Sequence, residues 1–238
     1  MLNVNLRLFG GRGAGAGNGG GTVVKDTDGK GIRISNETDV WSERHKAERE
    51  AAADLVISAT RDMNDEYGVM DNVETVTVAK MSNPFVMAFY APSENKVVMN
   101  RAFMNVERTE NTYKECVNSK FHPPLGKKSA IEAITAHELG HAIADKINES
   151  RKAKGINVDV NSQVVIDAFY KLNTKPMYDI EAKVKLSRAR QNISGYAAKN
   201  YHETVAEAVA DVYCNGGRAK KFSKAIVDEL KKTIKNEL

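Results

Sequence analysis

The segment His137-Glu138-Leu139-Gly140-His141 carries two imidazoles and a carboxylate at a spacing that could hold a metal ion. Residues four apart on a helix lie on one face, one turn from each other, so both imidazoles can reach one zinc ion. Glu138 then faces the same place without binding the metal, and could take a proton from a metal-bound water. The pattern predicts a zinc hydrolase with His137 and His141 as ligands and Glu138 as general base. The plainer interpretation is a pair of core or solvated histidines on an ordinary amphipathic helix.

The residues around this motif predict a helix with a buried face. Ser129 and Glu132 have the S-x-x-E spacing of a capping box, which marks a helix start. No proline interrupts residues 125–175. Apolar residues recur at helical spacing through the motif, namely Ile131, Ile134, Leu139, Ile143 and Ile147. The motif is therefore expected inside a helix that packs against a core.

A catalytic zinc site needs a third protein ligand besides the two histidines. The extended pattern H-E-x-x-H-x-x-G-x-x-H is absent, because its last two fixed positions hold Ala144 and Ile147. Asp145 lies about 12 Å along the helix from His137, too far for both to bind one ion. We therefore expect Asp145 to be a buried partner of another group or a surface charge.

A second predicted helix offers better candidates for the third ligand. Asn200 can cap its start, and Gly216-Gly217 can end it. Three acids fall on one face, at i, i+4 and i+8: Glu203, Glu207 and Asp211. Such a row is usually a solvated stripe, but here the neighbouring positions are alanine and valine. The helix is mostly apolar, so its acids are expected to have a role.

The two motifs together resemble the gluzincin type of zincin metalloprotease. Residues 194–207 look like the C-terminal half of the anthrax lethal factor-like catalytic domain, where a tyrosine stands seven residues before the zinc-binding glutamate, as Tyr196 stands before Glu203. The resemblance implies one zinc ion bound by His137, His141 and Glu203, with Glu138 as general base. It also implies Tyr196 as a hydroxyl donor to the oxyanion and Glu207 as an acceptor behind a ligand.

Some of these roles also follow from general chemistry, although each residue has a plainer interpretation as well. A ligating histidine usually donates its other ring N–H to a carboxylate, which Glu207 or Asp145 could supply. A tyrosine hydroxyl can stabilise a tetrahedral oxyanion as a preorganised donor. The alternatives are a half-buried loop tyrosine for Tyr196 and a plain surface acid for Glu207.

The region before the metal helix predicts a small sheet. Residues 73–79, 84–90 and 96–100 read as strands, with a turn at 91–95. In zincins such a hairpin holds the edge strand that pairs with an extended peptide through main-chain hydrogen bonds. The alternative is an ordinary hairpin. Residues 101–128 are predicted as a connecting loop of unassigned role, in which the lone His122 could line the cleft or have no function.

Further helices are predicted at residues 42–66, with Ser42 as cap, and at 160–172, 177–191 and 218–236. With the strands they predict an α+β, zincin-like fold: a small mixed sheet with an edge strand, an active-site helix and a helical C-terminal half. Residues 1–35 are predicted as a flexible Gly-rich tail, and 36–238 as one metallopeptidase domain.

Composition is ordinary for a globular enzyme. A net charge of +4 is too small to indicate nucleic-acid binding. The sequence shows no signal-peptide pattern and no apolar stretch near 20 residues, so we expect no membrane association and a cytoplasmic protein. Cys116 and Cys214 are expected to be free thiols. Residues 6–13, LRLFGGRG, look similar to Gly-rich tags on some tailed-phage structural proteins, which implies a phage-encoded chain with phage structural proteins as partners or a place in the virion.

The sequence as a whole predicts a zinc-dependent endopeptidase that hydrolyses peptide bonds in a peptide or protein substrate with a metal-bound water. Two other interpretations remain open. One is a non-catalytic phage structural or morphogenesis protein that retains a zincin fold. The other is a structural zinc site with the same ligands. An intact Glu138 favours the enzyme, because a structural site has no need of a base.

Overall fold

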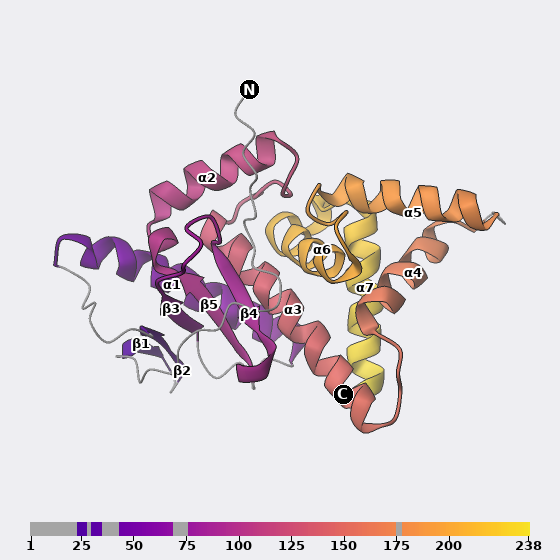
Figure 1. Cartoon of the computed structure of the whole chain (residues 1–238), viewed down its shortest axis with the longest axis horizontal. Helices are drawn as coiled ribbons and strands as arrows, with labels where there is room; N and C mark the ends of the chain where they lie inside the picture. Colours follow the sequence, from indigo (N-terminus) through magenta and orange to yellow (C-terminus); the bar gives the residue numbers. More distant parts are fainter. Residues whose placement is uncertain (1–22, 28–29, 35–42, 69–75, 175–177) are drawn as a thin grey trace.

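Figure 1 presents a computed structural model of the chain, which describes residues 23–27, 30–34, 43–68, 76–174 and 178–238. The architecture is α+β, as predicted, with one small sheet and a majority of helix. Most of the predicted tail and the predicted cap Ser42 lie outside the described residues. The last part of the range predicted as tail contains two strands, β1 (Val23–Thr27) and β2 (Lys30–Ile34).

The sheet is mixed, with the strand order β1-β2-β3-β5-β4. β3 (Val76–Ala79) runs parallel to both β2 and β5 (Lys96–Asn100). β4 (Ala88–Ala91) pairs antiparallel with β5 and lies at an edge of the sheet. A short 3-10 helix, η2 (Pro92–Glu94), makes the turn between them. The predicted hairpin and its edge strand are therefore confirmed.

The first strand of this hairpin is shorter than predicted. Asn83 folds the chain into a turn, because its side-chain oxygen accepts a hydrogen bond from the backbone N–H of Phe85 at 3.0 Å. Pairing with β5 therefore begins only at Ala88. Residues 73–75, the predicted start of the strand before it, lie outside the described residues.

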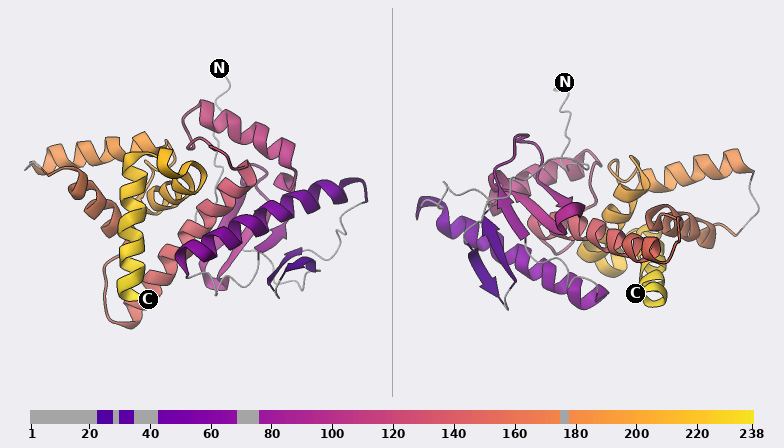
Figure 2. Two further views of the ribbon diagram at one scale, coloured as in Figure 1. Left: turned by 180° about the vertical axis from the view of Figure 1, so that it is seen from behind. Right: turned by 60° about the horizontal axis from the view of Figure 1, so that its bottom comes forward.

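The central element is the helix α3 (Ala130–Ala153), which carries the H-E-x-x-H segment. Its predicted capping box is present: Ser129 Oγ accepts a hydrogen bond from the backbone N–H of Glu132, and the Glu132 carboxylate accepts one from that of Ser129. α3 and α1 (Glu43–Tyr67) cover one face of the sheet, as Figure 2 shows from behind. α3 is thus fixed between the sheet and the helical half of the described chain.

The prediction of a connecting loop over residues 101–128 is wrong. The 3-10 helix η3 (Arg101–Phe103) and the helix α2 (Val106–Asn118) lie within it. Asn105 caps α2 by accepting a hydrogen bond from the backbone of Arg108. The buried side chains of α2 recur at helical spacing: Thr109, Tyr113 and Cys116. This face is short and partly polar, so its periodicity gives a weak signal in the sequence.

Helices make up the C-terminal half of the described chain: α4 (Val160–Leu172), α5 (Asp179–Ile193), α6 (Tyr201–Asn215) and α7 (Lys221–Glu237). The predicted bounds agree to within three residues. α6 packs along α3, and α7 packs on α6 and α4. Both cysteines, Cys116 and Cys214, are free, as predicted, and both are buried. Among the described residues, no helix combines the length and apolar character needed to cross a membrane.

Candidate metal centre

Three side-chain atoms from α3 and α6 converge on one point. Nε2 of His137 lies 3.2 Å from Nε2 of His141 and 3.2 Å from Oε2 of Glu203, and the remaining side of the triangle, from His141 Nε2 to Glu203 Oε2, is 3.3 Å. In a tetrahedral zinc site with bonds of about 2.0–2.2 Å, ligand atoms lie roughly 3.3–3.6 Å apart. The triangle therefore has nearly the size that a zinc ion and an open fourth position require. These three residues were the predicted ligands.

The close packing of α3 on α6 brings Glu203 to the histidines. Gly140 faces α6, where a Cβ on it would lie only 3.0 Å from the Cα of Ala206 and 3.3 Å from the Cβ of Val209. A glycine at this position of the motif lets the two backbones approach. At the start of α6, Asn200 accepts a hydrogen bond from the backbone N–H of Glu203 at 2.8 Å, as predicted for the cap.

Glu207, one turn further along α6, lies behind the triangle. Its Oε1 is 2.9 Å from Nδ1 of His137, and Ser194 Oγ donates a 2.6 Å hydrogen bond to its Oε2. A proton on Nδ1 of His137 leaves the lone pair of Nε2 directed at the triangle. Of the two acids that could take this part, the structure places Glu207 against the histidine. Asp145 instead lies 3.3 Å from the hydroxyl of Tyr90.

His122, to which the sequence assigned either a place in the cleft or no function, lies against Glu207 behind the site. It is buried, and its Nδ1 lies 3.0 Å from Oε1 of Glu207. Its ring stacks on Tyr113 of α2, at 5.2 Å between centroids. The preceding residue, Phe121, accepts a backbone hydrogen bond from Tyr196, which ties the two loops together. The position of His122 follows from the way its loop packs in the fold, and no local sequence pattern marks it.

The third acid of the predicted row does not reach the metal centre. Asp211 accepts hydrogen bonds from the side chain of Asn215 and from the backbone N–H of Lys220, both at 2.9 Å. It therefore orders the connection between α6 and α7. Burial along the face explains why all three acids are partnered rather than solvated.

The electrostatics of the triangle favour positive charge. Burial lowers the pKa of His137, but hydrogen bonds with Glu203 and Glu207 outweigh it and raise that pKa to about 10. Burial opposes ionisation of the two acids, yet their contacts with the histidines lower the pKa of Glu207 to about 2 and hold that of Glu203 far below its ordinary value. Two carboxylates that stay ionised in a buried site suit a divalent cation.

Tyr196 lies beside the triangle and is fully buried, with 1% of its surface exposed. Its ring centroid is 5.8 Å from that of His137, and its side chain hydrogen bonds with Glu203. Burial, with the nearby acids, raises the pKa of Tyr196 well above its ordinary value. The phenol is therefore neutral and can act as a donor. The alternative of a half-buried loop tyrosine does not match this environment.

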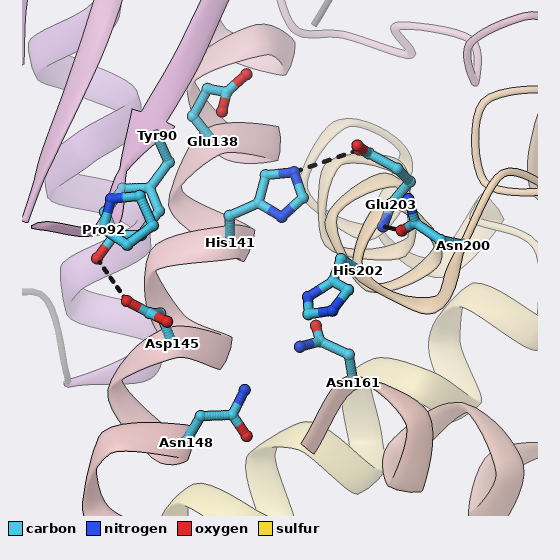
Figure 3. A pocket seen from close by; sticks show the side chains of 10 residues that line it. All are labelled: Tyr90, Pro92, Glu138, His141, Asp145, Asn148, Asn161, Asn200, His202 and Glu203. Atoms are coloured by element: carbon cyan, nitrogen blue, oxygen red, sulfur yellow. Dashed lines mark hydrogen bonds and ion pairs between the residues drawn. The ribbon is translucent and has the colours of Figure 1, made fainter. Parts of the chain in front are cut away.

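A cavity of about 340 Å³ opens on the triangle, and Glu138 and His141 line its upper part in Figure 3. Glu138 is buried, and within the described part of the chain its Oε1 has no hydrogen-bond partner. Burial raises the pKa of Glu138 above its ordinary value, against the opposing effect of the two histidines. A buried carboxylate with a free oxygen beside a cavity can accept a proton from a molecule bound there.

Comparison with known proteins adds no relative to this picture: no protein-family model matches the chain, and no curated protein matches it in sequence.

Proposed function

We propose that this chain is a zinc-dependent endopeptidase with a zincin-like fold of the gluzincin type. The observation that carries the proposal is the triangle of His137, His141 and Glu203 next to the free carboxylate oxygen of Glu138. Two imidazoles and one carboxylate form a known catalytic zinc set. Imidazole nitrogen suits zinc better than magnesium or calcium, which prefer oxygen ligands.

Each residue has a part in the proposed reaction. Zinc, when bound, polarises a carbonyl and makes a water molecule more acidic. Glu138 takes the proton of the attacking water and passes it to the leaving amine. Its raised pKa helps it to hold that proton between the two transfers. Tyr196 donates its hydroxyl hydrogen to the oxyanion, and Glu207 orients His137 through Nδ1.

The position of the edge strand β4 supports the proposal that the substrate is a peptide. Tyr90 of β4 and Pro92 just after it line the cavity, so this edge borders the candidate site. An extended peptide that adds to the edge makes main-chain hydrogen bonds with little regard to its sequence. This arrangement suits an enzyme that accepts a peptide segment rather than a small molecule.

A structural zinc site would use the same ligands but would leave Glu138 without a part. A non-catalytic phage structural or morphogenesis protein with a zincin fold would keep neither the buried free carboxylate nor the cavity for a chemical reason. The cavity beside the triangle therefore favours the enzyme.

The direct test is to load the purified chain with zinc, measure the zinc stoichiometry, and incubate it with an unbiased peptide library. We expect one zinc per chain, cleavage of some peptides, and loss of cleavage with a chelator that returns on adding zinc. His137→Ala, His141→Ala and Glu203→Ala should each weaken zinc binding. No zinc after metal-replete purification would contradict the proposal, and bound zinc without any cleavage would favour the structural site.

A further inference from the structure

The cavity continues from the metal centre along α3 and ends in a polar floor that the proposed reaction does not use. Glu138, His141, Asp145 and Asn148 follow one another along one face of α3 and all line it. Tyr90 and Pro92 form one wall in Figure 3, and residues of α6 form the other. From His141 to Asn148 the helix rises about 10 Å. Only a long substrate side chain spans that depth.

Asn161 at this floor has an acceptor without a partner. It is 2% exposed, and its Oδ1 has no hydrogen-bond partner within the described part of the chain. Its Nδ2 donates to Asp159 Oδ1 at 3.1 Å, which fixes the orientation of the carboxamide. Figure 3 shows the carboxamide between Asn148 and His202, with its oxygen on the side of the His202 ring. A buried carbonyl oxygen left without a donor is costly, so this position calls for a donor from a ligand.

Apart from the imidazole of His202, the other groups of the floor carry negative charge or are already hydrogen bonded. The carboxylate of Asp145 projects from the facing side and has the hydroxyl of Tyr90 as a partner at 3.3 Å. Asp159 lies just behind the floor, where it also accepts from Asn148 Nδ2 at 2.9 Å. Neither lysine nor arginine is among the described residues that line the cavity. The floor thus offers acceptors and anionic charge to whatever enters it.

We propose that this floor is a specificity pocket for a long cationic side chain, arginine or lysine, next to the cleaved bond. Asn161 Oδ1 accepts a hydrogen bond from the side-chain head group, and Asp145 supplies the opposite charge. Cationic heads carry several donors and no acceptor, which matches a floor of acceptors. The inference rests on the proposed peptidase function, because it takes the triangle as the place where the substrate backbone is held.

The test uses zinc-loaded protein and short peptide hydroxamates, which chelate an open zinc and need no turnover. The residue beside the chelating group is varied on either flank as arginine, citrulline or norleucine, and affinity is measured by calorimetry. We expect arginine to bind at least tenfold more tightly than norleucine, with citrulline between them. Citrulline keeps three of the five N–H donors of arginine and loses the charge. The step from arginine to citrulline therefore tests mainly Asp145, and the step from citrulline to norleucine tests Asn161.

Two variants show which residue causes each difference in affinity between the hydroxamates. Asp145→Asn should remove the preference for arginine over citrulline, and Asn161→Leu should shrink the preference for citrulline over norleucine by roughly tenfold. The matched control Asp228→Asn changes an exposed acid of α7 and should leave the whole series unchanged. Melting temperatures show whether each variant is folded. If Asn161→Leu does not fold, the hydroxamate affinities of the wild-type protein still test the pocket.

The outcomes separate the two claims. If the hydroxamates bind but norleucine equals or exceeds arginine, the pocket assignment is wrong and the metal centre stands. If the protein holds zinc and no hydroxamate binds, the open position is missing and the proposed function fails together with the pocket.

Discussion

Oε1 of Glu207 lies 2.9 Å from Nδ1 of His137, on the side of the imidazole away from the metal triangle. The same oxygen lies 3.0 Å from Nδ1 of His122, and Ser194 donates to the other oxygen. A single buried carboxylate thus joins two loops to His137, a candidate metal ligand. Its position one turn after Glu203 means that α6 supplies both a candidate ligand and the group that orients another candidate ligand.

Glu207→Gln keeps the size of this side chain and removes its charge. Because the histidine then loses a charged acceptor, zinc affinity should fall about 10–100-fold. Competition with a chromophoric chelator measures the change. Asp211→Asn, one turn along α6, serves as the comparison and should leave zinc affinity unchanged, since within the described residues Asp211 accepts its hydrogen bonds from Asn215 and Lys220. Equal effects of the two substitutions would show that Glu207 has no special link to the metal.

His122→Phe keeps an aromatic ring in the buried position and removes the donor to Glu207. A buried carboxylate that loses a partner should cost about 1–3 kcal/mol in the free energy of unfolding. Denaturant titration measures this loss, and His45→Phe, on the exposed surface of α1, is the control. A variant as stable as the wild-type protein would mean that the 3.0 Å contact contributes nothing.

Gly140→Ala tests the approach of α3 and α6. The added methyl meets the Ala206 backbone at 3.0 Å, and such overpacking should destabilise the protein by about 1–3 kcal/mol. Better helix propensity recovers at most about 1 kcal/mol. Because Glu203 moves with α6, zinc affinity should fall as well. Gly217→Ala is the matched control, with open space around its Cβ. A stable Gly140→Ala protein with unchanged zinc affinity would contradict the packing argument.

The sequence predicted the parts of this site that follow from local spacing. His137, Glu138 and His141 lie within one and a half turns of one helix, and Glu203 and Glu207 within one and a half turns of another, so periodicity groups the residues within each helix. The pairing of the two groups is implied by the resemblance to gluzincins. The partner of His122 could not be predicted, because its contact with Glu207 spans 85 residues and depends on the packing of α2, which was not predicted from the sequence. Helix length separates Asp145 from the predicted ligands, and Asp145 lies outside the group formed by His137, His141 and Glu203. Its contact with Tyr90 depends on where β4 lies. Local chemistry is visible in a chain, whereas contacts between distant segments require the fold.

Tyr196→Phe removes only a hydroxyl. If that hydroxyl donates to the oxyanion, kcat should fall about 10²–10³-fold with substrate affinity little changed, because the bond strengthens as charge develops. Steady-state kinetics on the best library peptide measures the split between kcat and KM. Tyr170→Phe, an exposed tyrosine of α4, should behave as wild type. A Tyr196→Phe enzyme with normal kcat would assign this tyrosine to packing alone.

The measurement that most directly tests catalysis by this site is the turnover of Glu138→Gln at matched zinc content. Glu138 does not belong to the metal triangle, so zinc stoichiometry and melting temperature should stay near wild type. Turnover should fall by about 10²–10⁴-fold or more, the loss expected when a general base is removed. A Glu138→Gln protein that binds zinc and cleaves peptide at a near-normal rate would contradict the account.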